Sequence, residues 1–241
     1  MSGHSKWATI RRAKGATDAK RGAAFTKLTR EIVAAAREGG GNPEFNVRLR
    51  LAVDKAKAGN MPKDNIERAI ARATGQGEDT ANFEEVTYEV YLPHKVSALI
   101  AVVTDNRNRA VADVRKLITR AGGQFDGAAV AWQFNRKGVI VIEKSPGISF
   151  DAIFEMALEA GAEDIQDGEE AIEIITEPDA FRTVRDALVA KNIPLASAEL
   201  AMVPTTTSEL DEEKTEQVMN VIDQLEELDD VQTVYHNLQL T

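Results

Sequence analysis

Apolar residues recur at intervals of three and four through the first third of the chain, which is typical of amphipathic helices. The pattern predicts a helix over residues 23–38, a second helix that begins at Asn42-Pro43, and a third that begins at Pro62. Short loops join these helices, so we expect a small bundle around one shared core. The expected core residues are Phe25, Leu28, Ile32, Ala35, Ala36, Phe45, Leu49, Ala52, Val53, Ala56, Ile66, Ala69, Ile70 and Ala73.

The pattern changes after a polar segment at residues 75–82, which predicts a domain boundary. Val86–Leu92 and Val96–Thr104 are rich in residues that favour strands and are separated by a short turn, so they predict a β-hairpin. A helix is expected over residues 107–121, where apolar side chains again recur at helical spacing.

Strand and helix patterns alternate from residue 128 to residue 204. Ala128–Phe134 predicts a strand that ends in a turn at Asn135–Gly138. The segments after that turn have the order strand, helix, strand, strand, helix, strand, which is the order of a ferredoxin-like domain. Their expected ranges are 139–143, 149–160, 163–167, 170–176, 179–191 and 197–203.

The C-terminal segment predicts one more helix and one more strand. Ser208 is the expected N-cap of a helix over residues 209–228, and a strand is expected at 231–238. That strand needs neighbours in a sheet, and the ferredoxin-like unit is already complete. We therefore expect it to pair with the strands of residues 86–104.

This pairing predicts an α+β fold in which one domain is inserted into another. The expected domains are an N-terminal three-helix domain at residues 1–78, a discontinuous α/β domain at 79–136 and 205–241, and an inserted ferredoxin-like domain at 137–204.

Charge is distributed unevenly between these domains. The chain has a net charge of −10, yet residues 1–75 contain 16 Lys and Arg against 7 Asp and Glu. The other 166 residues contain 13 basic and 32 acidic residues. This asymmetry indicates that the N-terminal segment meets a polyanion, which the acidic remainder would repel.

The strongest candidate site is a run of eight cationic side chains within residues 6–30, where Asp18 is the one acid. Lys and Arg suit phosphate contacts, which position a protein on nucleic acid without reading its sequence. Trp7 could stack on a base, or it could be a core residue of the bundle. The alternative for the whole run is a solvated surface. The cations are Lys6, Arg11, Arg12, Lys14, Lys20, Arg21, Lys27 and Arg30.

Two other groups of charged residues each have two possible roles. A second basic group on the helix at 107–121 either extends the binding surface or pairs on its own helix with Asp113. The acidic C-terminal helix is either a solvated outer face or a docking surface for a basic protein partner. The second basic group is Arg107, Arg109, Arg115, Lys116 and Arg120.

Several function classes have no support in the sequence. Cysteine is absent, which excludes disulfides and cysteine nucleophiles and is typical of a reducing compartment such as the cytoplasm. The three histidines are scattered, and neither a phosphate-binding loop nor a nucleophile-elbow motif occurs. The longest uncharged apolar stretch, Val96–Thr104, is about half a membrane span. We therefore expect a protein that is no enzyme, holds no cofactor or metal, and does not enter a membrane.

Longer motifs carry a family resemblance. The chain reads GHSKW at Gly3–Trp7, DAKRG at Asp18–Gly22, FTKLTREI at Phe25–Ile32, NMPKDNIERAI at Asn60–Ile70 and TDNRNRA at Thr104–Ala110. In these motifs it resembles the YebC/PmpR family across essentially its whole length. The resemblance implies the three-domain organisation and a DNA-binding transcriptional regulator of the bacterial cytoplasm. Some family members resemble ribosome-associated translation factors, among them the mitochondrial translational activator of cytochrome oxidase subunit one.

The resemblance also implies site residues, but no catalytic residue. Carried over position by position, the nucleic-acid contacts would be made by Lys6, Lys20, Arg21, Lys27, Arg107 and Arg109. Two loops depart from the family pattern. The chain reads YEVYLPHKV at Tyr88–Val96 in place of a YEGYGPGG-like turn, and QFDGAA at Gln124–Ala129 in place of a Gly/Ser-rich loop. Glycine permits close approach of a backbone to a ligand, so these loops indicate a divergent branch.

Three functional hypotheses follow. The first is duplex DNA binding with transcriptional control, and the second is binding to ribosomal or other structured RNA with translational control. The third is an acidic protein-docking module. The first two depend on the same electrostatic feature, so the sequence leaves both open.

Overall fold

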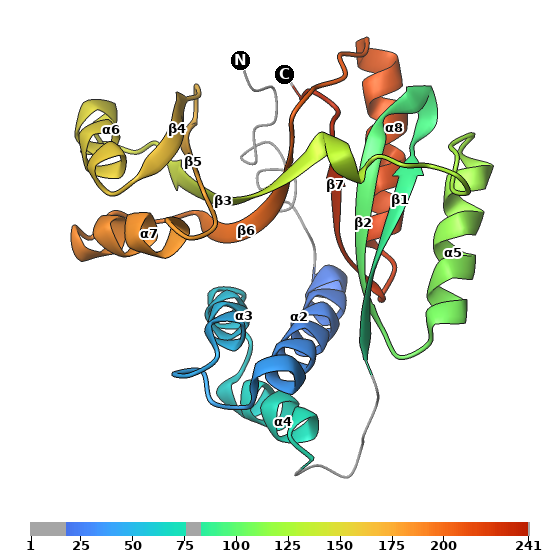
Figure 1. Ribbon diagram of the computed structural model, residues 1–241, viewed down its shortest axis with the longest axis horizontal. Coiled ribbons are helices and arrows are strands. Elements are labelled where there is room, and N and C mark those ends of the chain that lie inside the picture. Colours follow the sequence, from blue (N-terminus) through green and yellow to red (C-terminus); the bar gives the residue numbers. More distant parts are fainter. Residues whose placement is uncertain (1–17, 76–82, 241) are drawn as a thin grey trace. The chain divides into compact units, whose positions relative to one another are not determined.

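The computed structural model of the chain describes residues 18–75 and 83–240 (Figure 1), which form two compact units. The helical–sheet unit consists of residues 18–75, 83–130 and 211–236, and the ferredoxin-like unit of residues 131–210 and 237–240. The expected α+β fold class is confirmed, whereas the boundaries of the three expected domains stay a prediction. No helix within the described ranges has both the length and the apolar character needed to cross a membrane.

Helices α2 (Asp18–Gly39), α3 (Val47–Ala58) and α4 (Lys63–Ala73) begin the helical–sheet unit. Their apolar stripes pack together, because each stripe lies along one side of its helix. The core residues expected from the spacing are buried or partly buried, with the exception of Phe45, which is 86% exposed.

The turn before α3 explains that exception. The helix was expected to begin at Pro43, and this prediction was wrong. Asn46 is the N-cap, and its Oδ1 accepts a hydrogen bond from Leu49 N at 3.0 Å. The Nδ2 of the same side chain donates to the carbonyl oxygens of Ala35 at 2.7 Å and Gly40 at 2.8 Å. One buried amide thus satisfies backbone groups of both helices and fixes the turn between them.

The sheet of this unit combines strands from distant parts of the chain. Among the described residues, β1 (Glu84–Tyr91), β2 (Ser97–Thr104) and β7 (Val231–His236) are antiparallel neighbours in that order. The expected hairpin and the pairing of the C-terminal strand with it are therefore confirmed. Helices α5 (Arg107–Arg120) and α8 (Glu212–Glu226) contact each other and this sheet, and α2 contacts β2 and β7 (Figure 1).

The N-cap of α8 is Asp211. The sequence analysis expected Ser208 in this position, and that prediction was wrong. The Oδ1 of Asp211 accepts a hydrogen bond from Lys214 N at 2.9 Å. Ser208 instead forms a parallel bridge with Leu238, in which Ser208 N donates to Asn237 O at 2.7 Å. A carboxylate also interacts favourably with the positive end of a helix dipole, which a hydroxyl does not.

The ferredoxin-like unit has the expected βαββαβ order. Its described strands form an antiparallel sheet in the order β4-β5-β3-β6, and α6 and α7 contact each other. The elements are η2 (Ala131–Gln133), β3 (Phe134–Glu143), α6 (Phe150–Glu159), β4 (Ala162–Asp167), β5 (Ala171–Thr176), α7 (Phe181–Ala190) and β6 (Ser197–Pro204).

Strand β3 is continuous, so the predicted strand at Ala128–Phe134 and the predicted turn at Asn135–Gly138 were wrong. Gly138 pairs with Thr176 in the middle of the sheet. A Cβ at residue 138 would lie 2.3 Å from Thr176 Oγ1 and 2.5 Å from Phe181 Cδ2. This glycine therefore serves close packing of β3 against β5 and α7, and not a turn.

Candidate nucleic-acid interface

Part of the candidate set has no described side chain, and its role stays a prediction. The residues outside the described ranges are Lys6, Trp7, Arg11, Arg12 and Lys14. For Lys20 and Arg21, in the first turns of α2, the structure describes the helix backbone. The candidates with described side chains are Lys27 and Arg30 on α2 and Arg107 and Arg109 in the first turn of α5, of which Arg107 is exposed.

Lys27 lies half-buried at the C-terminal end of α8. Its Nζ donates to the main-chain carbonyl oxygen of Glu226, the last residue of that helix. Helix α8 has no basic residue in its own last turn, so Lys27 supplies the positive charge that favours the negative end of the helix dipole. Burial lowers the pKa of Lys27, while the charges of Glu226 and Asp229 act in the opposite direction.

Arg30 follows on α2 and contacts the turn between α8 and β7. Its Nη1 is 2.8 Å from Asp230 Oδ1, and the two side chains are only 13% and 9% exposed. The guanidinium also donates to the carbonyl oxygen of Asp229 and lies 5.7 Å from the centre of the Phe83 ring. The pair is therefore largely removed from water, where loss of one partner leaves an uncompensated charge.

Arg109 reaches the same carboxylate from α5. Its Nε is 3.1 Å from Asp230 Oδ2 and its Nη2 is 2.9 Å from Asp230 Oδ1, which is a two-point arrangement. The Nη2 also donates to Asp105 Oδ1 at 2.6 Å, and this hydrogen bond holds the pKa of Asp105 below its usual value. Asn106 positions the arginine, because its side chain caps α5 by accepting from Arg109 N. We call Lys27, Arg30, Arg109 and Asp230 the Asp230 cluster.

The second basic group is divided between different partners. Arg109 pairs with Asp230, and not with Asp113 on its own helix, which was one of the two alternatives. Arg115 pairs with Asp126 in the loop after α5, with 2.8 Å between Nη2 and Oδ1. The docking of α5 beside the α8–β7 turn accounts for the first pair, which helical spacing alone does not reveal.

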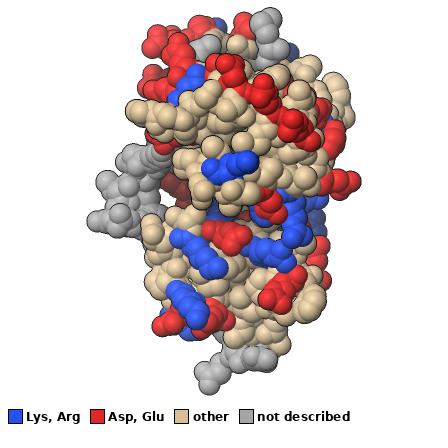
Figure 2. Space-filling view, turned by 90° about the vertical axis from the view of Figure 1, so that its left-hand side faces the viewer, with Lys and Arg blue, Asp and Glu red and all other residues tan. Residues whose placement is uncertain are grey.

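Carboxylates also accompany the cations of α3. Arg48 pairs with Glu85, and Lys55 Nζ is 3.1 Å from Glu31 Oε2. In the lower part of the face shown in Figure 2, Lys and Arg side chains stand beside Asp and Glu side chains. Carboxylates on α2 and β1 therefore balance part of the positive charge of α3.

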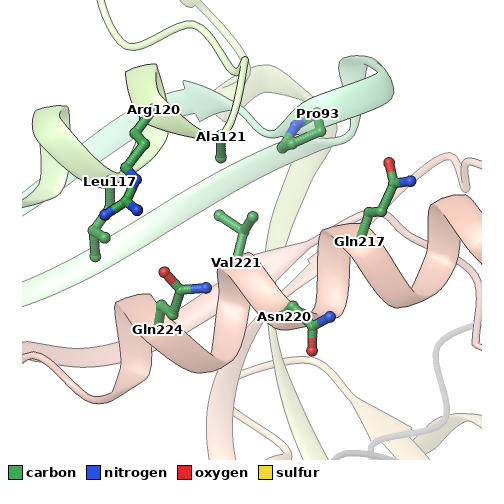
Figure 3. Close-up of a pocket in the computed structure, with 8 residues that line it drawn as sticks. All are labelled: Pro93, Leu117, Arg120, Ala121, Gln217, Asn220, Val221 and Gln224. Carbon is green, nitrogen blue, oxygen red and sulfur yellow. The ribbon is translucent and has the colours of Figure 1, made fainter.

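A pocket of about 400 Å³ lies between α5, α8 and the short turn η1 (Pro93–Lys95), as Figure 3 shows. The amides of Gln217, Asn220 and Gln224 line it, together with the guanidinium of Arg120. Gln217 Oε1 is 2.9 Å from His94 Nε2. These side chains can donate hydrogen bonds to a small polar molecule and accept them from it.

Sequence reasoning missed Asp230, which pairs with two of the candidate cations, Arg30 and Arg109. A signal was present in the acidic residues that follow one another near the end of α8, because acids there oppose the helix dipole. Such a helix end favours a cation from elsewhere in the chain. The sequence did not indicate which cation, since Lys27 and Arg30 are far from Asp230 along the chain.

Comparisons with known proteins agree with the resemblance in the sequence motifs. Residues 5–76 match the family model described as TACO1/YebC protein N-terminal domain, and residues 83–238 match the model described as TACO1/YebC second and third domain. A protein of Geobacter sulfurreducens named "probable transcriptional regulatory protein" is 51% identical over 242 residues, which are 100% of this chain and 97% of that protein. A protein of the same name from Treponema pallidum is 52% identical over 241 residues, covering 100% and 98%. The crystal structure of a conserved hypothetical protein from Aquifex aeolicus has a TM-score of 0.83 and 43% identity, covering 93% of this chain and 92% of that one.

Proposed function

The chain belongs to the TACO1/YebC family, and we propose that it is a non-enzymatic, cytoplasmic regulator of gene expression that binds duplex DNA. The observation that carries the proposal is the run of eight cations with one acid in residues 6–30. Such a surface repels itself unless a polyanion neutralises it. The names of the curated relatives support a transcriptional role.

The proposed phosphate contacts are made mainly by the cations before residue 22. These residues are Lys6, Arg11, Arg12, Lys14, Lys20 and Arg21, with Trp7 against a base or a groove. Lys27, Arg30 and Arg109 have partners within the chain, so their contribution requires those partners to be displaced. The acidic α/β part would keep the nucleic acid on one side of the protein or dock a protein partner.

The second candidate is binding to ribosomal RNA with translational control, which the same cations favour. A mobility-shift titration with duplex DNA at several salt concentrations, run beside co-sedimentation with ribosomes, separates the two. If about five phosphates are neutralised, log K falls with log salt at a slope of about −4.5, or roughly 500-fold between about 50 and 200 mM salt. Co-sedimentation without duplex binding at physiological salt would reject the transcriptional proposal. If both assays are negative, the remaining hypothesis is the protein-docking module.

A further inference from the structure

The carboxylate of Asp230 occupies a position that suits an anionic ligand. It lies in the turn between α8 and β7, where Arg109 contacts both of its oxygens and Arg30 contacts one. Arginine binds carboxylates and phosphates through the same two-point geometry. The two arginines come from different helices, α2 and α5, so they form a built anion site and not a pair of neighbours on one surface.

We propose that the Asp230 cluster is a binding site for a backbone phosphate of nucleic acid, and that Asp230 occupies it as an internal substitute when no nucleic acid is bound. The inference rests on the proposed function, because it takes the ligand to be a polynucleotide. Binding would displace Asp230 from Arg30 and Arg109 and turn both guanidiniums towards the phosphate. The α8–β7 turn thus competes with nucleic acid for the same cations.

The other contacts in the cluster are compatible with this exchange. Lys27 and Arg30 also donate to main-chain carbonyl oxygens, of Glu226 and Asp229, and these groups carry no net charge. Ionised acceptors form stronger hydrogen bonds with cations than neutral acceptors do. A phosphate could therefore replace those carbonyl oxygens as the acceptor for the two cations.

The burial of the cluster indicates which anions can open it. Arg30 and Asp230 are only 13% and 9% exposed, so separating them costs free energy that the binding of one phosphate has to exceed. A polynucleotide would supply more binding free energy than a single ion if, as proposed above, the cations in residues 6–21 bind further phosphates of the same strand. The site is therefore expected to respond to nucleic acid and not to inorganic phosphate.

The test compares Asp230→Asn with a matched control, Asp229→Asn, in the full chain. Asp229 is exposed and contributes its carbonyl oxygen to Arg30, so its substitution makes the same change in net charge one residue away. We expect Asp230→Asn to bind a 20-base-pair duplex about tenfold more tightly than the control, because no internal carboxylate then competes for Arg30 and Arg109. Adding Arg30→Gln or Arg109→Gln to Asp230→Asn should remove this gain.

The outcomes separate the inference from the proposed function. If the unmodified chain binds nucleic acid and the two single variants bind equally, the inference is overturned while the function stands. If none of the proteins binds duplex DNA or ribosomes, the function itself is rejected. If Asp230→Asn does not fold, amide hydrogen exchange of the unmodified chain tests the inference instead. Exchange at residues 226–231 should accelerate with saturating duplex and not with inorganic phosphate, and unchanged exchange would reject the inference.

Discussion

Arg30 and Asp230 form an ion pair of 2.8 Å between the first described helix and the turn before the last strand, with both side chains nearly buried. Because Asp230 directly precedes β7, the pair connects α2 to the sheet made of β1, β2 and β7. Arg109 completes the contact from α5. One carboxylate thereby links three elements that are widely separated along the chain.

Arg30→Ala should destabilise the helical–sheet unit. The substitution leaves Asp230 with Arg109 but without its second guanidinium, and we expect a loss of about 2 kcal/mol in the free energy of unfolding. Urea denaturation followed by circular dichroism measures this loss. Arg48→Ala is the control, because Arg48 pairs with Glu38 and Glu85 at exposed positions, where each pair contributes about 1 kcal/mol or less. Equal midpoints for the two variants would contradict the prediction.

Gly138→Ala should destabilise the ferredoxin-like unit through overpacking. The new methyl group would lie 2.3 Å from Thr176 Oγ1 and 2.5 Å from Phe181 Cδ2, so the strand or helix must shift. The expected cost is about 1–3 kcal/mol, measured as a lower thermal midpoint. Gly59→Ala is a suitable comparison, because its Cβ would meet the flexible end of Leu28 at 3.2 Å. A midpoint for Gly138→Ala no lower than that of Gly59→Ala would show that the site can relax.

Lys20→Ala combined with Arg21→Ala should weaken nucleic-acid binding at every sequence tested. Two phosphate contacts are lost, so the slope of log K against log salt should become shallower by about 2. The matched control removes two exposed cations of α3 and α4, Lys57 and Lys63, which are outside the proposed contact run. An unchanged slope in the first variant would exclude Lys20 and Arg21 from the interface.

The carboxyl group of Asp105 should titrate at lower pH than an ordinary aspartate. The hydrogen bond from Arg109 lowers its pKa from the usual 3.8. A folded-state pKa below the unfolded value adds stability that is present above pH 3.8 and is lost as the pH falls through the folded value. In Arg109→Gln the pKa should rise towards 3.8, which carbon-detected NMR titration measures.

A second carboxyl group provides the control for that titration. Lys214 lowers the pKa of Asp211 in the same direction, so Arg109→Gln should leave Asp211 unchanged while Lys214→Ala raises its pKa. A low pKa for Asp105 that persists in Arg109→Gln would show that another group is responsible.

The helices and most strands were predictable because their signals are local. The stripe through Leu28 and Ile32 predicts which side of α2 is buried whatever the helix packs against. The C-terminal strand was also predictable, since an unpaired strand after a complete ferredoxin-like order needs a sheet elsewhere.

The errors at Pro43, Ser208 and Gly138 have a common cause. Each residue type occurs in more than one setting: proline at helix starts and in turns, serine at caps and in backbone bridges, and glycine in turns and at close contacts. Neighbouring residues do not distinguish these settings.

Local spacing and charge were thus sufficient for the α+β class, the ferredoxin-like order and the cationic character of the N-terminal segment, because each depends on residues close together in the chain. The partners of those cations depend on how helices dock. Arg30 and Arg109 meet at Asp230 only once α2 and α5 are packed beside the α8–β7 turn. In the folded protein, Arg30 and Arg109 therefore contact the carboxylate of Asp230, whereas the sequence predicted that they contact nucleic acid. The physical reason is that burial of apolar faces packs the helices together and brings charged residues from distant parts of the chain into contact.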